Sequence, residues 1–244
     1  MDKLSIKKAD NMLQLPFGQK QYTVAPTKII ALGLNYRDHI QESRSVKVRG
    51  FTDEIPAEPI LFPKTPNVLI GPDQAVIIPK FLKSYQFKNP RVDYEGELAL
   101  IISKRCKNVP EASAFDVILG FTIMNDVSQR NLQTGDRSGW FRGKSLDTFG
   151  PIGPCIVAMD QIGNPQNLGL QTRLNNKIVQ DSNTRHMIFS IPRIIAFIST
   201  NFTLETGDII LTGTPSGVGP LQHNDTIEIE IEKIGVLRNT VVEE

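Results

Sequence analysis

The sequence predicts an α+β fold built mainly from β-strands, of the sandwich or rolled type. Many short apolar runs are separated by turn residues, whereas only two or three segments carry a helical pattern. Strands and helices alternate too sparsely for a doubly wound parallel sheet. At 244 residues, the chain is long enough to bury one substantial core. We therefore expect a short arm over residues 1–25 and one large domain over residues 26–244.

Most of the predicted strands are apolar-rich segments of three to seven residues, and several of them end before Gly, Pro, Asn or Asp. In chain order they cover residues 28–32, 59–62, 75–78, 91–102, 120–124, 152–158, 170–174, 177–180, 209–211 and 226–231. Asn175 and Asn176 form the expected hairpin turn between two of them. The last run alternates apolar and polar residues, which predicts a half-buried strand.

The clearest helical pattern covers residues 190–198, because four isoleucines there fall on one helical face. Ser190 can cap this helix, and Pro192 is placed in its first turn. A short helix is also expected over residues 110–117. The polar residues of the segment 125–128 predict a further helix start, and this helix would carry Arg130 and Gln133.

Composition excludes several classes of function. The net charge is +1 with 22% charged residues, well mixed along the chain, so we expect no nucleic-acid partner. The longest apolar stretch, residues 117–124, is far too short for a transmembrane helix, and we expect no membrane partner. The N-terminal ten residues lack an apolar signal core, and the two cysteines fit a reducing compartment. These observations predict a cytoplasmic protein.

Three carboxylates stand beside apolar runs, at Glu95, Glu97 and Asp126. Residues two apart on a strand share one face, so Glu95 and Glu97 would repel each other on a buried face unless a cation lay between them. Oxygen ligands without His or Cys favour Mg²⁺, with Mn²⁺ or Ca²⁺ as alternatives, over Zn²⁺. The competing interpretation is a solvated strand face with Asp126 capping a helix.

Residues 35–57 are polar and about twice the length of an ordinary connection, so they are either disordered or a functional lid. Within them, His39 precedes Glu42 by three residues, which places a carboxylate beside the imidazole on one helical turn. Such a pair can act as a general base or activate water. The alternative is a surface histidine on a loop.

Further residues could act beside a metal ion. Lys144 could stabilise developing negative charge or relay a proton, although most lysines are simply solvated. Arg130 and Gln133, three residues apart, could hold a substrate carboxylate or form a surface ion pair. The Gly-rich segment 213–219 lacks a phosphate-binding signature, and it predicts instead a tight turn that offers the Thr214 hydroxyl to a small anion.

Five sequence blocks together resemble the fumarylacetoacetate hydrolase family, from about Lys28 to the C-terminus. They cover residues 33–39, 92–98, 125–130, 143–149 and 207–219. The resemblance implies a mixed β-roll that forms a homodimer. It also implies that Glu95, Glu97 and Asp126 bind the metal, and that His39, Glu42 and Lys144 are catalytic. In the same comparison, Arg130, Gln133 and Thr214 correspond to substrate-binding groups.

Members of this family act on small 2-oxo acids by hydrolysis of a carbon–carbon bond, decarboxylation or keto–enol isomerisation. The segments 147–154, 179–184 and 230–236 are most similar to the branch of fumarylacetoacetate hydrolase domain-containing protein 2, which is associated with oxaloacetate tautomerase activity. The resemblance therefore implies oxaloacetate tautomerisation first. Oxaloacetate decarboxylation, acylpyruvate hydrolysis and a non-catalytic 2-oxo acid binder are the alternatives.

Overall fold

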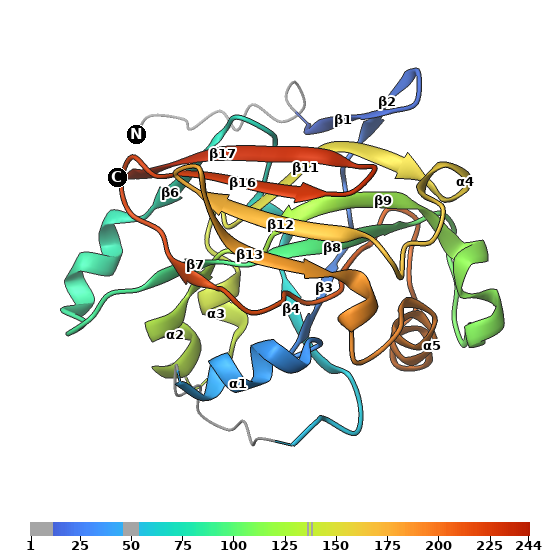
Figure 1. Cartoon of the computed structure of the whole chain (residues 1–244), viewed down its shortest axis with the longest axis horizontal. Helices are drawn as coiled ribbons and strands as arrows, with labels where there is room; N and C mark the ends of the chain where they lie inside the picture. The colour runs from blue at the N-terminus through green and yellow to red at the C-terminus, as the bar shows by residue number, and fades with distance from the viewer. Residues whose placement is uncertain (1–11, 46–53, 136, 138) are drawn as a thin grey trace, which may run out of the picture.

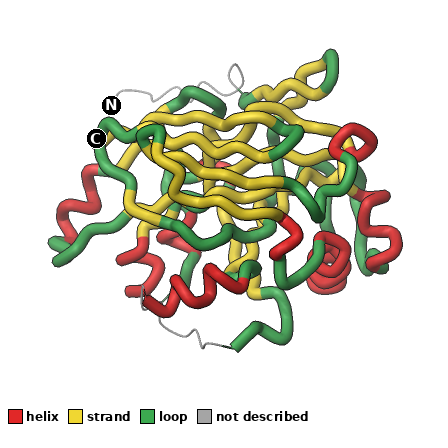
Figure 2. The backbone as a smooth tube through the Cα atoms, viewed as in Figure 1, coloured by secondary structure: helices red, strands yellow, loops and turns green. Residues whose placement is uncertain are grey.

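Strands form the centre of the molecule and helices lie around its edges (Figure 1, Figure 2). The computed structural model describes residues 12–45, 54–135, 137 and 139–244. Within these residues, the strands assemble into one large mixed sheet, a five-stranded sheet and a three-stranded sheet. The prediction of a mainly β, α+β fold is therefore confirmed.

The large sheet has the strand order β2-β1-β11-β9-β8-β14-β3-β4, with β5 paired to β11. Its strands are β1 (Gln14–Phe17), β2 (Lys20–Thr23), β3 (Ile29–Gly33), β4 (Ile60–Lys64), β5 (Leu69–Ile70), β8 (Gly96–Ile102), β9 (Ile118–Asn125), β11 (Gly150–Ala158) and β14 (Ile209–Leu211). Most neighbours are antiparallel, but β14 runs parallel to β3, and both β1 and β5 run parallel to β11.

The two smaller sheets complete the β-structure. The five-stranded sheet, in order, contains β13 (Lys177–Asn183), β12 (Gly169–Leu174), β16 (Thr226–Ile231), β17 (Gly235–Glu243) and β6 (Ala75–Ile78). The three-stranded sheet contains β10 (Ser128–Gln129), β7 (Val92–Tyr94) and β15 (Gly219–Pro220).

Helices are short and peripheral. The α-helices are α1 (Arg37–Ser45), α2 (Arg130–Gly135), α3 (Phe141–Lys144), α4 (Met159–Ile162) and α5 (Ile191–Asn201). The 3₁₀ helices are η1 (Pro66–Val68), η2 (Lys80–Tyr85), η3 (Glu111–Val117) and η4 (Thr184–His186). As predicted, the Ser190 side chain caps α5 by accepting from the Arg193 N–H.

Strand β8 is buried on both faces and lies between two apolar cores. Leu98 and Leu100 pack with residues of the five-stranded sheet and α5, whereas Ala99 and Ile101 pack with β3 and β14 on the other face. The five-stranded sheet lies in front of β8 and β9 in Figure 1. The two cores therefore hold β8 in place. Glu95 directly precedes β8, Glu97 stands at its start, and Asp126 follows the end of β9.

Three features of the local prediction were wrong. Glu95 lies between β7 and β8 rather than within one continuous strand. The helix expected to start near Asp126, α2, begins only at Arg130, because residues 128–129 form β10. Strand β10 forms there because the edge of β7 is available for antiparallel pairing. The hairpin β1–β2 and the long strand β17 were not predicted. Leu15 of the expected arm is nevertheless fully buried.

The proposed lid over residues 35–57 is described only in part, because residues 46–53 lie outside the described residues. Its first half forms α1, which Figure 1 shows at the edge of the molecule below the sheets. Asn35 anchors the beginning of this segment, since its amide donates to Thr212 O at 2.8 Å and its oxygen accepts from Phe189 N–H at 2.7 Å.

We expect Leu100→Ala to lower the free energy of unfolding by about 2–5 kcal/mol, because the truncation leaves a cavity in the strand that separates the two cores. Urea unfolding would measure this change. Ile178→Ala is the control, since Ile178 is 56% exposed and should change stability by no more than about 0.5 kcal/mol. Equal effects of the two substitutions would contradict the central place given to β8.

Candidate active site

The antiparallel pairing of β8 with β9 brings the acidic residues together. Gly96 pairs with Asn125, and the Asp126 N–H donates to Glu95 O at 2.9 Å just beyond the paired ends. One carboxylate oxygen from each of Glu95, Glu97 and Asp126 lies within 4.8 Å of the others. All three residues are buried. The interpretation as a solvated strand face is therefore wrong.

Glu97 has the least satisfied carboxylate of the three. Its Oε2 accepts from the Gly213 N–H at 2.6 Å, whereas Oε1 has no hydrogen-bond partner among the described residues. Burial, followed by the charges of Asp126 and Glu95, raises the pKa of Glu97 well above its ordinary value. A divalent cation would satisfy this oxygen, and three carboxylates are the ligand set that Mg²⁺ or Mn²⁺ prefers. The residues present therefore fit such an ion.

Lys144, at the end of α3, points at the same carboxylates. Its Nζ donates to Glu95 Oε2 at 2.9 Å and to Asp126 Oδ2 at 2.6 Å, and the residue is 1% exposed. It is therefore not the solvated lysine of the alternative interpretation. Burial alone would lower the pKa of Lys144, but the charges of Asp126 and Glu95 outweigh burial and raise it.

A second buried lysine, Lys64, was missed by the sequence analysis. Its Nζ donates to Asp126 Oδ1 at 2.6 Å and also to the backbone oxygen of Lys144. Burial lowers the pKa of Lys64, and the charge of Asp126 offsets this lowering only in part. The signal in the sequence was that Lys64 closely follows the apolar run 60–62. A lysine buried with such a strand needs an acidic partner, because an unpaired buried ammonium is rare.

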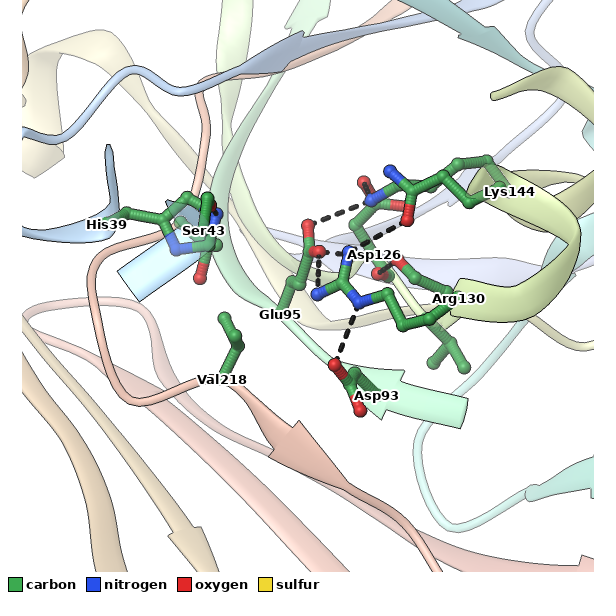
Figure 3. A network of polar contacts seen from close by, with 12 residues as sticks. His39, Ser43, Asp93, Glu95, Asp126, Arg130, Lys144 and Val218 are labelled. Carbon is green, nitrogen blue, oxygen red and sulfur yellow. Dashed lines mark hydrogen bonds and ion pairs between the residues drawn. The ribbon is translucent and has the colours of Figure 1, made fainter. Parts of the chain in front are cut away.

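Arg130 is tied to the metal-ligand candidates rather than lying on the surface. Its Nη2 lies 2.6 Å from Glu95 Oε1, and its Nε lies 2.7 Å from Oδ2 of the buried Asp93 (Figure 3). Its Nη1 donates to Gln133 Oε1 at 2.9 Å. Burial alone would raise the pKa of Glu95, but the charges of Lys144 and Arg130 hold that pKa below its ordinary value. Asp93, which also binds Arg91 at 2.7 Å, was not singled out from the sequence.

His39 lies across from Glu95 on α1, as Figure 3 shows. Its Nδ1 is 3.5 Å from Glu42 Oε2, and its Nε2 is 3.3 Å from Ser43 Oγ. His39 is 7% exposed, so the alternative of a surface histidine on a loop is wrong.

Glu42 connects α1 to the Gly-rich segment 213–219. Its Oε2 accepts from the Gly217 N–H at 2.9 Å and from the Val218 N–H at 3.4 Å. Burial alone would raise the pKa of Glu42, but the hydrogen bonds from His39 and Gly217 outweigh burial and lower it. Only glycine fits at position 217, because φ is +97° and an added Cβ would lie 1.9 Å from Val179 O.

Thr214 lies in the same loop, 2% exposed. Its hydroxyl donates to Gly96 O at 2.9 Å and accepts from Gln180 Nε2 at 2.8 Å. These bonds hold the loop against the start of β8, next to the acidic residues.

One pocket brings most of the candidate residues together. Its lining includes seven polar residues, which are His39, Ser43, Glu95, Arg130, Gln133, Lys144 and Thr214. Apolar side chains complete the wall. Of the three clustered carboxylates, only Glu95 is part of the lining. The arrangement is a small polar pocket that adjoins the three-carboxylate group through Glu95, which suits recognition and proton transfer on a small acid.

We expect Mg²⁺ or Mn²⁺ to raise the thermal unfolding temperature, and by more as pH rises from about 5 to about 8. Without the ion, the raised pKa of Glu97 means that the folded state binds this proton more tightly than the unfolded state. The metal-free protein therefore loses stability toward unfolding as pH rises from the ordinary pKa of a glutamate through the raised pKa of Glu97. Metal binding needs the deprotonated carboxylate and so offsets this loss at higher pH.

Glu97→Gln is the matched control, because it keeps the shape and removes both the titration and the ligand charge. In this variant, neither the metal-dependent shift nor its growth with pH should remain. A variant that still gained the full wild-type shift would show that the ion binds elsewhere.

None of the helices in the described part of the chain has the length and apolar character needed to cross a lipid bilayer.

Comparison with known proteins places these residues in a family. Residues 28–242 match the family described as fumarylacetoacetate (FAA) hydrolase C-terminal. The chain is 49% identical to an uncharacterized protein of Archaeoglobus fulgidus over 90% of its own length and 80% of the relative. It is 40% identical to the mitochondrial oxaloacetate tautomerase of Rattus norvegicus, over 89% and 67% of the two chains.

A solved structure shows the same fold. Maleylpyruvate hydrolase from Sphingobium sp. SYK-6, in complex with manganese(II) ion and pyruvate, superimposes with a TM-score of 0.74 at 33% identity, covering 91% of this chain and 72% of that one. The matched family model spans nearly the whole described domain, and both relatives exceed 30% identity. The chain is therefore a member of the fumarylacetoacetate hydrolase family.

Proposed function

We propose that this protein is a divalent-metal-dependent enzyme that interconverts the keto and enol forms of oxaloacetate. One observation carries the proposal: the buried group of Glu95, Glu97 and Asp126 adjoins, through Glu95, a pocket lined by Lys144, Arg130 and His39. One oxygen of Glu97 in this group has no partner among the residues that the structure describes. The mitochondrial tautomerase among the relatives, 40% identical, supports this reaction over others of the family.

A divalent ion held by Glu95, Glu97 and Asp126 would act as a Lewis acid that polarises the 2-oxo group of the substrate. The protein itself supplies binding and proton transfer. Arg130, with Gln133 fixed at 2.9 Å from its Nη1, lines the pocket and would hold a substrate carboxylate. Thr214 lines the same pocket, and its hydroxyl would bind the carboxylate by turning its proton away from Gly96 O. The substrate is then oriented between these groups and the apolar wall of the pocket.

Proton transfer falls to two groups that face the pocket from different elements. Lys144 reaches it from α3 and His39 from α1, with Glu42 orienting the imidazole through Nδ1. In the keto-to-enol direction, one group removes the proton from C3 and the other protonates the enolate oxygen at C2; the reverse direction removes the O–H proton and protonates C3. Both lie in a largely buried environment, where a positioned acid or base contributes about 10²- to 10⁴-fold to the rate.

A second candidate activity is hydrolysis of small acylpyruvates. It is favoured by the His39–Glu42 pair, which has the arrangement of a base that activates water, and by the maleylpyruvate hydrolase among the structural neighbours. A small 2-oxo acid is the partner in either case. The homodimer and the cytoplasmic location expected from the sequence stay predictions.

The two activities separate in one spectrophotometric experiment. Enol-oxaloacetate absorbs in the ultraviolet, and we expect the purified protein with Mg²⁺ to speed the loss of this signal without forming pyruvate. Pyruvate formed in step with the loss would indicate decarboxylation. Faster cleavage of acetylpyruvate than turnover of oxaloacetate would instead favour hydrolysis, and no turnover of any of the three would reject the proposal.

We expect His39→Ala to reduce acylpyruvate hydrolysis by about 10²- to 10⁴-fold, because water activation needs the imidazole. Tautomerisation should fall less, since Lys144 still provides one of the two proton transfers and water can take over the other. Parallel rate measurements on both substrates would test this difference. The matched control is His223→Ala, because His223 lies outside the pocket that contains His39. Equal losses on both substrates in the His39 variant would refute the separate role of the dyad.

A further inference from the structure

An aromatic wall faces the polar groups of the pocket. Phe62 and Trp140 both line it, and their rings meet edge to face with centroids 5.1 Å apart. The centroid of the same Phe62 ring lies 4.8 Å from the Lys144 ammonium. Phe62 therefore contacts both Trp140 and Lys144, and Lys144 in turn donates to Asp126. This chain of contacts connects the carboxylates with the aromatic wall.

Trp140 and Lys144 share one turn of the chain. The Lys144 N–H donates to Trp140 O at 3.1 Å, so the two residues stand four apart on one helical turn. Residues with this spacing project from the same side of a helix. The same short element thus presents an ammonium to the base of the pocket and an indole to its wall.

Gly33 makes room for the indole. An added Cβ at Gly33 would lie 2.7 Å from one Trp140 ring carbon and 2.8 Å from another, which is closer than atoms of real side chains approach. Leu32 and Leu34, on either side of Gly33, also line the pocket. Trp140 is therefore held between the end of β3 and Phe62, and it has little freedom to move away from a longer ligand.

We propose that Trp140 is a specificity-determining residue, which limits the chain that a 2-oxo acid can carry beyond its reacting carbons. This inference rests on the proposed function and extends it to the size of the substrate. A 2-oxo acid bound at the carboxylates and beside Lys144 extends its tail along Phe62 toward the indole. A four-carbon acid such as oxaloacetate ends before that wall, whereas a longer acid meets it.

The test is a binding series rather than an activity assay. Pyruvate, 2-oxobutanoate, 2-oxopentanoate and 2-oxohexanoate share one head group and differ only in tail length. Their dissociation constants would be measured by calorimetry in the presence of Mn²⁺, with oxalate as a reference that has no tail. In the wild type, we expect the affinity to fall once the tail reaches the wall.

Trp140→Ala should raise the affinity for 2-oxohexanoate relative to pyruvate by about tenfold or more, since one or two methylenes then gain space. Trp140→Phe, which keeps an aromatic ring against Phe62, should give a smaller gain in the same direction and serves if the alanine variant does not fold. The affinity for oxalate should stay unchanged in both variants. Phe141→Ala is the matched control, because the neighbouring Phe141 is 42% exposed and is absent from the pocket lining.

The outcomes separate this inference from the proposed function. An unchanged ratio of 2-oxohexanoate to pyruvate in the Trp140 variants overturns the role of Trp140, whatever reaction the enzyme performs. If the Trp140 variants change the preference for tail length but the protein does not turn over oxaloacetate, the inference is supported and the proposed tautomerase activity is rejected. A wild type that binds none of these acids overturns the inference, whereas the proposed function is decided by turnover of oxaloacetate.

Discussion

The burial of three carboxylates at the ends of two paired strands is the constraint on which the rest of this structure depends. An ionised carboxylate taken out of water without compensation costs several kcal/mol. The protein meets this cost with three cationic side chains from three separate elements, Lys64, Lys144 and Arg130. The strands are in turn covered on both faces, so the carboxylates cannot turn away from one another.

The three buried carboxylates differ in how many positively charged partners they have within the protein. Glu95 and Asp126 each accept from at least one ammonium or guanidinium group. Glu97 accepts only a backbone N–H at one oxygen, and its other oxygen has no partner among the described residues. Glu97 is thus the carboxylate that a divalent ion would stabilise most. The residues present therefore fit a bound metal ion better than a self-contained ion-pair network.

The pocket above the carboxylates has two unlike sides. Polar groups from α1, α2, α3 and the Gly-rich segment 213–219 provide charge and hydrogen bonds, while Phe62, Trp140 and the leucines beside Gly33 provide an apolar wall. The two sides are joined through Lys144, which contacts carboxylates with its ammonium and the Phe62 ring with the same group. In the proposed function, recognition of the acid and exclusion of longer ligands would both depend on this short helical turn.

The sequence by itself determined the mainly β class, most strand positions and the residue types of the site. Those features follow from local apolar runs, turn residues and the chemistry of acidic groups beside them, which are all readable over a few residues. The missed strands β1, β2 and β17 and the later start of α2 depend on which partner edge is available, and a local pattern does not contain that information. Likewise, Lys64 lies 62 residues from Asp126 in the chain, and Gly33 lies over 100 residues from Trp140. Only the tertiary structure decided these contacts, because they arise from the packing of strands and loops that are distant in sequence.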